Sequence, residues 1–401
     1  MTAALGGVRV VEFTTALAGP LACRYLAEAG AEVIKVESGG RGLDSFRIFS
    51  ADGNLDGSAR FLESNLGVMS ILLNLRSDEG LGLAKELIRE CDVLVDNFRP
   101  DVMERLGLGV EAVQEVNPKM VIVKLPGFGS TGPRATQGSW GPNLLAHTGM
   151  THLWNLPDHD EPIGTQSVYP DYVAAAFAPA VISAALVNRE RTGRGTYVDL
   201  AQAELMGYML GASALEWFVT GIDPEPLGNR SRDVSPHGCY PCLGDDRWCV
   251  VVVETDEQWA RLARLMGQPE LAGDSRFDTV VGRLTNRAEV DALVSGFTSK
   301  MGPFEVMSTL QGAGIAAGVV QTAEDLWSDP QLEWRSAVAE VTHPVLGTMA
   351  MPVIPIQISE GGIVAPTSAP LLGEHATQIL GELLGHSEDQ LDELRERGVL
   401  S

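Results

Sequence analysis

The stretch VRVVEFTTALAGPLACRYLAEAGAEVIKVE, residues 8–37, decides the fold class. Residues 8–13 are rich in β-branched side chains and predict a strand. Gly19-Pro20 then opens an amphipathic helix that runs to Ala29, and Gly30 stands where a left-handed helix stop is expected. Residues 32–36 predict a second strand. This order is typical of a parallel unit of strand, helix and strand.

The same alternation continues through the first half of the chain. Further strands are predicted at residues 70–75, 93–97, 120–125 and 197–200, and Ser77 is a candidate N-cap for the helix that follows the first of these. Strand–helix alternation of this kind predicts an α/β fold with a Rossmann-like, doubly wound parallel sheet. Such sheets bind ligands beyond the carboxyl ends of their strands.

The second half predicts a change of domain. Two long apolar helices are expected at residues 172–188 and 201–220, and residues 221–236 then carry three prolines without a clear period. A strand at 248–253 and three helical patterns, near 256–266, 286–300 and 304–311, follow. We therefore predict a large domain over residues 1–221, a smaller α+β domain with its linker over 222–330, and a C-terminal segment over 331–401.

Composition limits the classes of partner. The formal net charge of −24 disfavours nucleic acid and anionic membrane surfaces, because both attract a basic face. No apolar run approaches the ~20 residues that cross a bilayer, and the N-terminus lacks the basic and apolar regions of a signal peptide. Five cysteines, an odd number, indicate reduced thiols and a cytoplasmic location.

Two short motifs suggest cofactors but lack the necessary context. Residues 127–132 fit G-x-G-x-x-G after a strand, yet Pro133 follows and no helix begins there, so a tight glycine turn explains them better than a dinucleotide site. Cys239 and Cys242 form a C-x-x-C pair without the second pair that a zinc site normally has. The sequence therefore predicts no metal and no tightly bound cofactor.

Asp171, in Pro170-Asp171-Tyr172, opens the most apolar helix of the chain. Helix capping alone would explain an aspartate at this place. The functional alternative is a carboxylate beside a hydrophobic wall and free backbone N–H groups. Such a carboxylate can attack an activated acyl group, and the N–H groups can hold the oxyanion that forms.

Taken together, several segments resemble the family III CoA transferases, which include formyl-CoA and carnitine CoA transferases and methylacyl-CoA racemase. The resemblance covers nearly the whole chain. It rests on Ala18-Gly19-Pro20, Gly30 to Glu37, Asn97-Phe98-Arg99-Pro100, Gly127 to Pro133, Arg191 to Gly195, Asp329-Pro330 and Leu372-Gly373-Glu374-His375.

The resemblance implies a large Rossmann-like domain built from both chain ends, with the small domain inserted, and a homodimer of interlocked ring-shaped subunits. It implies that coenzyme A or acyl-CoA is a substrate. The catalytic aspartate falls on Asp171, and the CoA-contacting segments fall on Leu17, Ala18, Leu73, Asn74, Leu75, Arg76, Asn97, Phe98, Arg99, Arg105, Pro126, Gly127, Phe128 and Gly129. The CoA phosphates would then meet arginines such as Arg99 and Arg105 at the strand ends.

The implied reaction transfers CoA from an acyl-CoA donor to a carboxylic acid acceptor through an acyl-aspartyl anhydride and an aspartyl-CoA thioester. Trp140, Met150 and Trp154 lie between the glycine turn and Asp171. If they line the acyl pocket, the acceptor is bulky and apolar or aromatic; they can equally pack the core. Succinyl-CoA is a plausible donor.

Two alternatives remain open at this point. A racemase of the same family would need bases on both sides of the α-carbon, and the racemases that resemble this chain place a His-Asp pair where it has Ser139-Trp140-Gly141-Pro142. His147 is only a few residues away. The other alternative is a catalytically silent CoA-binding subunit of a heteromeric transferase, which the presence of Asp171 disfavours.

Overall fold

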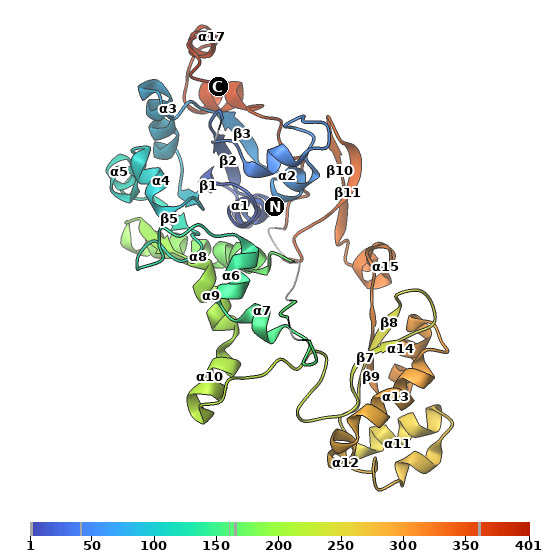
Figure 1. Ribbon diagram of the computed structural model, residues 1–401. Helices are drawn as coiled ribbons and strands as arrows, with labels where there is room; N and C mark the ends of the chain where they lie inside the picture. Colours follow the sequence, from blue (N-terminus) through green and yellow to red (C-terminus); the bar gives the residue numbers. More distant parts are fainter. Residues whose placement is uncertain (1–2, 41, 160, 164–166, 360–361) are drawn as a thin grey trace. The chain divides into compact units, whose positions relative to one another are not determined.

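The computed structural model describes residues 3–40, 42–159, 161–163, 167–359 and 362–401. Contacts between residues divide the chain into two compact units, which we describe separately. The large unit consists of Met1–Met150, Thr165–Ile222 and Trp334–Ser401, and the small unit of Thr151–Gly164 and Asp223–Glu333. Figure 1 colours the chain from blue to red, so the blue and green elements and the red C-terminal elements of the large unit can be followed there.

A six-stranded parallel sheet is the centre of the large unit. Its strand order is β3-β2-β1-β4-β5-β6, which is the order of the doubly wound dinucleotide-binding fold. Val10 pairs with Val33 on one side and with Val93 on the other, so β1 lies in the middle. The strands are β1 (Arg9–Phe13), β2 (Glu32–Glu37), β3 (Met69–Leu72), β4 (Val93–Asp96), β5 (Val121–Lys124) and β6 (Thr196–Asp199).

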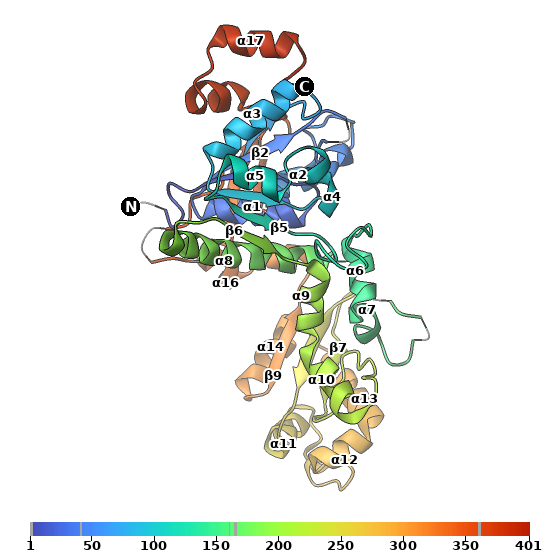
Figure 2. The same ribbon diagram turned by 90° about the vertical axis from the view of Figure 1, so that its left-hand side faces the viewer.

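Both faces of this sheet are covered, as its continuous apolar strands require. Successive side chains alternate between the faces, so Val11 and Ile34 belong to one core while Val10 and Val33 belong to the other. The first core is closed by α3 (Asp78–Arg89), α4 (Pro100–Arg105), α5 (Val110–Val116), η3 (Gln378–Leu383) and α17 (Glu388–Glu396). The second is closed by α1 (Ala18–Glu28) and α8 (Tyr169–Thr192) (Figure 2).

Helix α8 packs on α1 and the sheet through small side chains. Ala174, Ala175 and Ala178 are fully buried, and α1 is buried at nearly every position. Among the described residues, α8 alone has the length and mean hydropathy, 24 residues and 1.5, that a membrane span would need. The expectation that no segment reaches this limit was therefore wrong for α8, and a buried core helix meets the same criterion.

The C-terminal segment is held to the first strands of the sheet. The Ser70 hydroxyl accepts a hydrogen bond from the Gly373 N–H at 3.0 Å, and the His375 N–H donates to the Ser70 carbonyl at 2.9 Å. Further along, the Asn74 N–H donates to the Val399 carbonyl at 2.7 Å. The Leu372-Gly373-Glu374-His375 motif thus attaches the last residues of the chain to β3, and Figure 1 shows the red C-terminus beside that strand.

The predicted helix over residues 201–220 is two helices. Leu210 separates α9 (Gln202–Met209) from α10 (Gly211–Thr220), because its backbone leaves the helical range at φ −90° and ψ 13°. The remaining elements of this part of the chain are η1 (Ser45–Phe49), α2 (Ala59–Ser64), α6 (Gly141–His147), α7 (Met150–Leu153), and a hairpin of β10 (Val338–His343) and β11 (Gly347–Pro352). The hairpin was not predicted from the sequence.

The small unit is an antiparallel sheet with helices around Trp259, which is fully buried. Its strands are β7 (His237–Pro241), β8 (Trp248–Val252) and β9 (Ala316–Val320), in that order. Its helices are α11 (Asp256–Leu265), η2 (Pro269–Ala272), α12 (Val280–Thr285), α13 (Arg287–Thr298), α14 (Pro303–Gly312), α15 (Ala323–Trp327) and α16, which ends at Trp334 (Pro330–Trp334). Residues 151–163 join this unit through contacts such as the Gly228 N–H bond to the Asn155 carbonyl.

The C-x-x-C pair belongs to this sheet. Cys239 lies in β7 and Cys242 directly after it, where Cys242 is buried. All five cysteines are free thiols. No cluster of three or more potential metal ligands occurs in the part of the chain that the structure describes.

A network of buried charges lies under the turn between β1 and α1. The Lys35 ammonium is fully buried, 2.9 Å from Asp44 Oδ2 and 3.8 Å from Glu12 Oε2. Next to it, the Arg47 guanidinium pairs with Glu37 at 2.8 Å. Burial alone would lower the pKa of Lys35, but the charges of Asp44, Glu12 and Glu37 outweigh burial and raise it. The ammonium therefore stays charged inside the protein.

Replacing Lys35 with methionine should destabilise the large unit strongly. The variant leaves Glu12 and Asp44 buried without their cation, and breaking such a pair costs roughly 3–5 kcal/mol. Thermal unfolding followed by circular dichroism measures the effect. Lys119→Met, at an exposed lysine, is the control and should stay near wild type. Equal melting temperatures for the two variants would show that the network is dispensable.

Candidate active site

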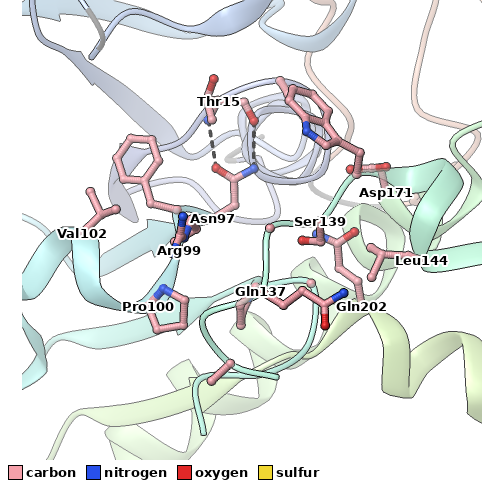
Figure 3. Close-up of a pocket in the computed structure, with 17 residues that line it drawn as sticks. Thr15, Asn97, Arg99, Pro100, Val102, Gln137, Ser139, Leu144, Asp171 and Gln202 are labelled. Atoms are coloured by element: carbon pink, nitrogen blue, oxygen red, sulfur yellow. Dashed lines mark hydrogen bonds between the residues drawn. The ribbon is translucent and has the colours of Figure 1, made fainter. Parts of the chain in front are cut away.

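A cavity of roughly 340 Å³ opens beyond the carboxyl ends of β1, β4 and β5 (Figure 3). Thr15 and Ala16 come from the turn after β1, residues 97–100 from the loop after β4, and Pro126 and Gly127 from the loop after β5. Further lining residues come from the loop before α6 and from α6 itself. The lining residues are Thr15, Ala16, Asn97, Phe98, Arg99, Pro100, Val102, Pro126, Gly127, Ala135, Gln137, Gly138, Ser139, Trp140, Leu144, Asp171 and Gln202. This is the switch point at which doubly wound sheets bind ligands.

Asp171 is the acidic residue in this lining. It is the third residue of α8, and Pro170 before it occupies a position where a missing N–H costs nothing. Its backbone N–H donates to the Val168 carbonyl at 3.0 Å, and its carboxylate accepts a hydrogen bond from the N–H of Ala18, the first residue of α1. Burial raises the pKa of Asp171 to about 6, although the nearby backbone N–H groups of Asp171 and Ala18 lower it. A carboxylate with little solvation, facing a cavity, is suited to act as a nucleophile.

The start of α1 approaches β4 closely enough to reach Asp171 because residue 19 is glycine. A Cβ atom at Gly19 would lie 2.7 Å from Thr14 Cβ and 2.9 Å from Asn97 Cγ, which is closer than real Cβ contacts. Asn97 in turn exchanges two hydrogen bonds with the Thr15 backbone, at 2.9 and 2.8 Å (Figure 3). These contacts fix the turn that presents the Ala18 N–H.

The buried ion pairs also hold the turn between β1 and α1. Ala16 has a φ of +62°, in the left-handed region that residues with a side chain rarely adopt. Its N–H donates to Asp44 Oδ1 at 3.0 Å, and Asp44 Oδ2 is the atom that pairs with Lys35. The ion network therefore holds the backbone conformation that precedes Ala18.

A second buried carboxyl shapes the loop after β4. Asp96 is fully buried and accepts the Phe98 N–H at 2.7 Å, while the Lys124 ammonium lies 3.6 Å from its other oxygen. Burial raises the pKa of Asp96 to about 7, against the lowering effect of Lys124. The bond to Phe98 turns residues 97–99 toward the cavity.

The predicted CoA-contacting residues divide among several places. Asn97, Phe98, Arg99, Pro126 and Gly127 line the cavity of Asp171. Leu75, Arg76, Phe98 and Arg105 line a second cavity of roughly 410 Å³, and Phe98 and Val102 belong to both linings. Leu17 and Ala18 are buried at the start of α1.

Besides Leu17 and Ala18, four of the predicted contacts line neither of these cavities. Leu73 is fully buried in the core, and Asn74 holds the C-terminal segment. Phe128 lines a different pocket and stacks edge-on against His147, with ring centres 5.2 Å apart. Gly129, with a φ of +84°, serves the turn after β5, where a side chain would be strained.

Of the three residues predicted for an acyl pocket, Trp140 lines the cavity of Asp171, and Met150 and Trp154 do not. Trp140 lines the cavity, and 64% of it is exposed. Met150 does not line it: only 3% of Met150 is exposed, because it packs with Leu145 and Met206. Trp154 belongs to the small unit and is absent from the lining.

Other cavity residues were not predicted, among them Thr15, Ser139, Leu144 and Gln202. Gln202 begins α9, and its side-chain amide donates to the Leu125 carbonyl at 3.1 Å. The position of Thr15 directly after a central strand was the one signal in the sequence that pointed to it.

His147 faces away from Asp171. Its Nδ1 lies 3.3 Å from the Arg134 guanidinium, and its Nε2 lies 3.1 Å from the Gln137 amide. It lines the pocket of Phe128 and not the cavity of Asp171. The structure therefore gives Asp171 no histidine partner within the lining of its cavity.

Known proteins resemble this chain over nearly its whole length. The sequence profile of CoA-transferase family III matches residues 5–376. The chain is 34% identical over 398 residues to succinyl-CoA–D-citramalate CoA-transferase of Chloroflexus aurantiacus, which covers 99% of this chain and 98% of that protein. It is 32% identical over 404 residues to the protein named probable CoA-transferase Rv1866 of Mycobacterium tuberculosis; this covers 98% of the chain but spans only half, 50%, of that relative. A crystal structure of a CaiB/BaiF family protein from Brucella suis superposes with a TM-score of 0.87 at 30% identity, over 96% of this chain and 100% of that one.

The raised pKa of Asp171 predicts a gain in stability on neutralisation. Between the ordinary pKa of an aspartate, about 4, and about 6, the folded protein keeps a proton that the unfolded chain releases, so wild-type stability falls as pH rises through this window. Asp171→Asn keeps an acceptor for the Ala18 N–H without the charge. Its melting temperature should exceed that of wild type by a few degrees near pH 8, and the difference should disappear near pH 4. A variant that melts lower than wild type near pH 8 would contradict this account.

Proposed function

Because the chain belongs to family III of the CoA-transferases, we propose that it moves CoA from an acyl-CoA donor to a carboxylic acid through covalent intermediates on Asp171. One observation carries this proposal. The carboxylate of Asp171 is partly desolvated, faces the switch-point cavity and accepts a backbone N–H from the start of a second helix. A simple helix cap would need neither the cavity nor the second helix.

The reaction proceeds by exchange at carbonyl carbons and needs no net proton transfer. An Asp171 oxygen attacks the donor thioester carbonyl, the C–S bond breaks, and CoA thiolate leaves an acyl-aspartyl anhydride. The thiolate then attacks the aspartyl carbonyl of the anhydride, which releases the donor acid and forms an aspartyl-CoA thioester. The acceptor carboxylate attacks this thioester and gives a new anhydride, and the thiolate finally attacks the acceptor's acyl carbon and frees Asp171.

The N–H group of Ala18 has a role in these steps. It already donates to the Asp171 carboxylate. When thiolate or acceptor attacks the aspartyl carbonyl, negative charge collects on one of those oxygens, and a donor already aimed at it stabilises the charge without rearrangement.

CoA would extend across the two neighbouring cavities. Its phosphates carry negative charge, and Arg76 and Arg105 line the cavity that does not contain Asp171. Arg105 is paired with Asp101 within one helix turn, and because this pair is exposed it costs little to exchange for a phosphate. Phe98 and Val102 line both cavities, so the part of CoA that joins its nucleotide to its thioester would pass beside them.

The donor we propose is succinyl-CoA, which the name of the Chloroflexus relative contains. For the acceptor we propose a bulky apolar or aromatic carboxylic acid. Its support within the cavity is the exposed indole of Trp140, with Leu144 beside it in the lining. Small dicarboxylates such as D-citramalate, the acid in the relative's name, are the competing class. Racemisation is disfavoured because His147 is turned toward Arg134 and Gln137.

Trapping the intermediate tests the nucleophile. The protein is incubated with succinyl-CoA and then with hydroxylamine, which converts the aspartyl-CoA thioester into a hydroxamate on the aspartate. Intact-mass measurement and peptide mapping should place the adduct on Asp171 in wild type, and its rate of formation should fall as pH falls through about 6, where the carboxylate takes up a proton. The adduct should persist in Asp52→Ala, at an exposed carboxylate outside both cavities, and vanish in Asp171→Ala. A wild-type protein without adduct across several acyl-CoA donors would refute the relay.

A second stage of the same assay addresses the acceptor. Wild type is given succinyl-CoA and equal concentrations of phenylacetate, benzylsuccinate, D-citramalate and glutarate, and the CoA thioesters formed are separated by chromatography. We expect the aromatic acids to be used in preference, and Trp140→Ala to reduce that preference. Preferential transfer to the small dicarboxylates would replace the acceptor class and leave the nucleophile untouched.

We also propose that the protein is a homodimer with interlocked subunits. Helix α10 has no buried residue, and it exposes Leu215, Trp217, Phe218 and Val219, with 79% of Phe218 exposed. A contiguous apolar surface of this kind usually marks an interface. Light scattering after gel filtration should give twice the mass of one chain for wild type and the mass of one chain for Phe218→Glu. A monomeric wild type would contradict the homodimer, and recovery of activity only with a second, different chain would point to the silent-subunit alternative.

A further inference from the structure

Gly141, the first residue of α6, stands directly against the carboxylate of Asp171. A Cβ atom at this position would lie 2.7 Å from Asp171 Oδ2. It would also lie 2.7 Å from Val168 Cβ and 2.8 Å from Val168 Cγ1. All three distances are shorter than real Cβ contacts, so the start of α6 packs on the start of α8 through a backbone that has no side chain.

Backbone conformation does not demand this glycine. Gly141 is not among the residues with a positive φ, whereas Gly129 and Gly132 in the preceding turn are. An alanine could therefore adopt the same backbone angles. What glycine provides at residue 141 is space, and the atoms that use this space are two carbons of Val168 and an oxygen of the proposed nucleophile.

The space fixes the direction of the carboxylate. On one side, the Ala18 N–H draws the Asp171 carboxylate toward the start of α1. On the other side, the Gly141 backbone allows Oδ2 to lie where any larger residue would displace it. A methyl group there would press on both Asp171 and Val168. The Asp171 side chain can rotate away from it, and the rotated carboxylate would lose its alignment with the donor N–H.

We propose that Gly141 is a positioning residue for the transfer reaction: its missing side chain holds the Asp171 carboxylate in the orientation that attacks the thioester. This inference rests on the proposed role of Asp171 as nucleophile. A misplacement of about 1 Å in a reacting group costs on the order of a hundredfold in rate, so the effect on chemistry should exceed the effect on folding or on CoA binding.

The experiment compares Gly141→Ala with Gly82→Ala. Gly82 also lies in a helix, α3, but an added Cβ there meets nothing within 4 Å. Hydroxamate formation from succinyl-CoA should be at least about tenfold slower in Gly141→Ala than in wild type, and CoA affinity by calorimetry should change less than about threefold, because Arg76 and Arg105 lie in the neighbouring cavity. Gly82→Ala should react like wild type.

A double-mutant cycle separates contact from activity. If the added methyl group presses on the carboxylate, Gly141→Ala should lower the melting temperature less in an Asp171→Ala background than in wild type. Normal adduct formation in Gly141→Ala would overturn the inference and leave Asp171 as nucleophile. Failure to fold in both backgrounds would also overturn it, since the glycine would then serve the fold alone. An absence of adduct in wild type itself would instead refute the proposed function.

Discussion

The close packing of α1 against α8 is the constraint on which the site depends. Both helices cover the same face of the parallel sheet, and buried alanines on α8 let the two backbones approach. Their N-termini therefore meet beyond the carboxyl ends of the strands, and Asp171 at the start of α8 accepts the N–H of Ala18 at the start of α1. The cavity, the desolvation of the carboxylate and its hydrogen bonds all follow from this single helix pair.

Buried charged side chains in turn fix the position of the turn before α1, although burial of charges is itself unfavourable. Burying Lys35 with Glu12 and Asp44 has a large desolvation cost, and pairs of this kind often add little net stability. What they provide here is a defined geometry. Asp44 bonds to Lys35 through one oxygen and to the strained Ala16 backbone through the other. The strain is confined to the residue that sets the direction of Ala18, where a positive φ is needed.

Much of the fold was predictable because its signals are local. The alternation of strands and helices predicted the doubly wound sheet, the stop at Gly30 has its positive φ, and Ser77 caps the helix that follows it. What the sequence left open is decided by contacts between residues distant in the chain. Met150 could line a pocket or pack the core on sequence alone, and its core partner Met206 is more than fifty residues away. Likewise, Gly141 meets Asp171 across thirty residues, and no local pattern encodes that contact.

The sequence motifs that resemble the family can now be understood as steric requirements. Gly19 makes room for Thr14 and Asn97, Gly127 for Ser139, and Gly195 for the Met120 carbonyl, since a Cβ at each would overlap these neighbours. These glycines allow backbones to approach so closely that a carboxylate can be partly withdrawn from water and still be ionised at neutral pH, because its pKa rises only to about 6. Burial without the Ala18 N–H would raise the pKa of Asp171 further and protonate the nucleophile, and this donor without burial would leave it well solvated and unreactive. The chemistry proposed for this chain therefore depends on packing that supplies both conditions at one atom.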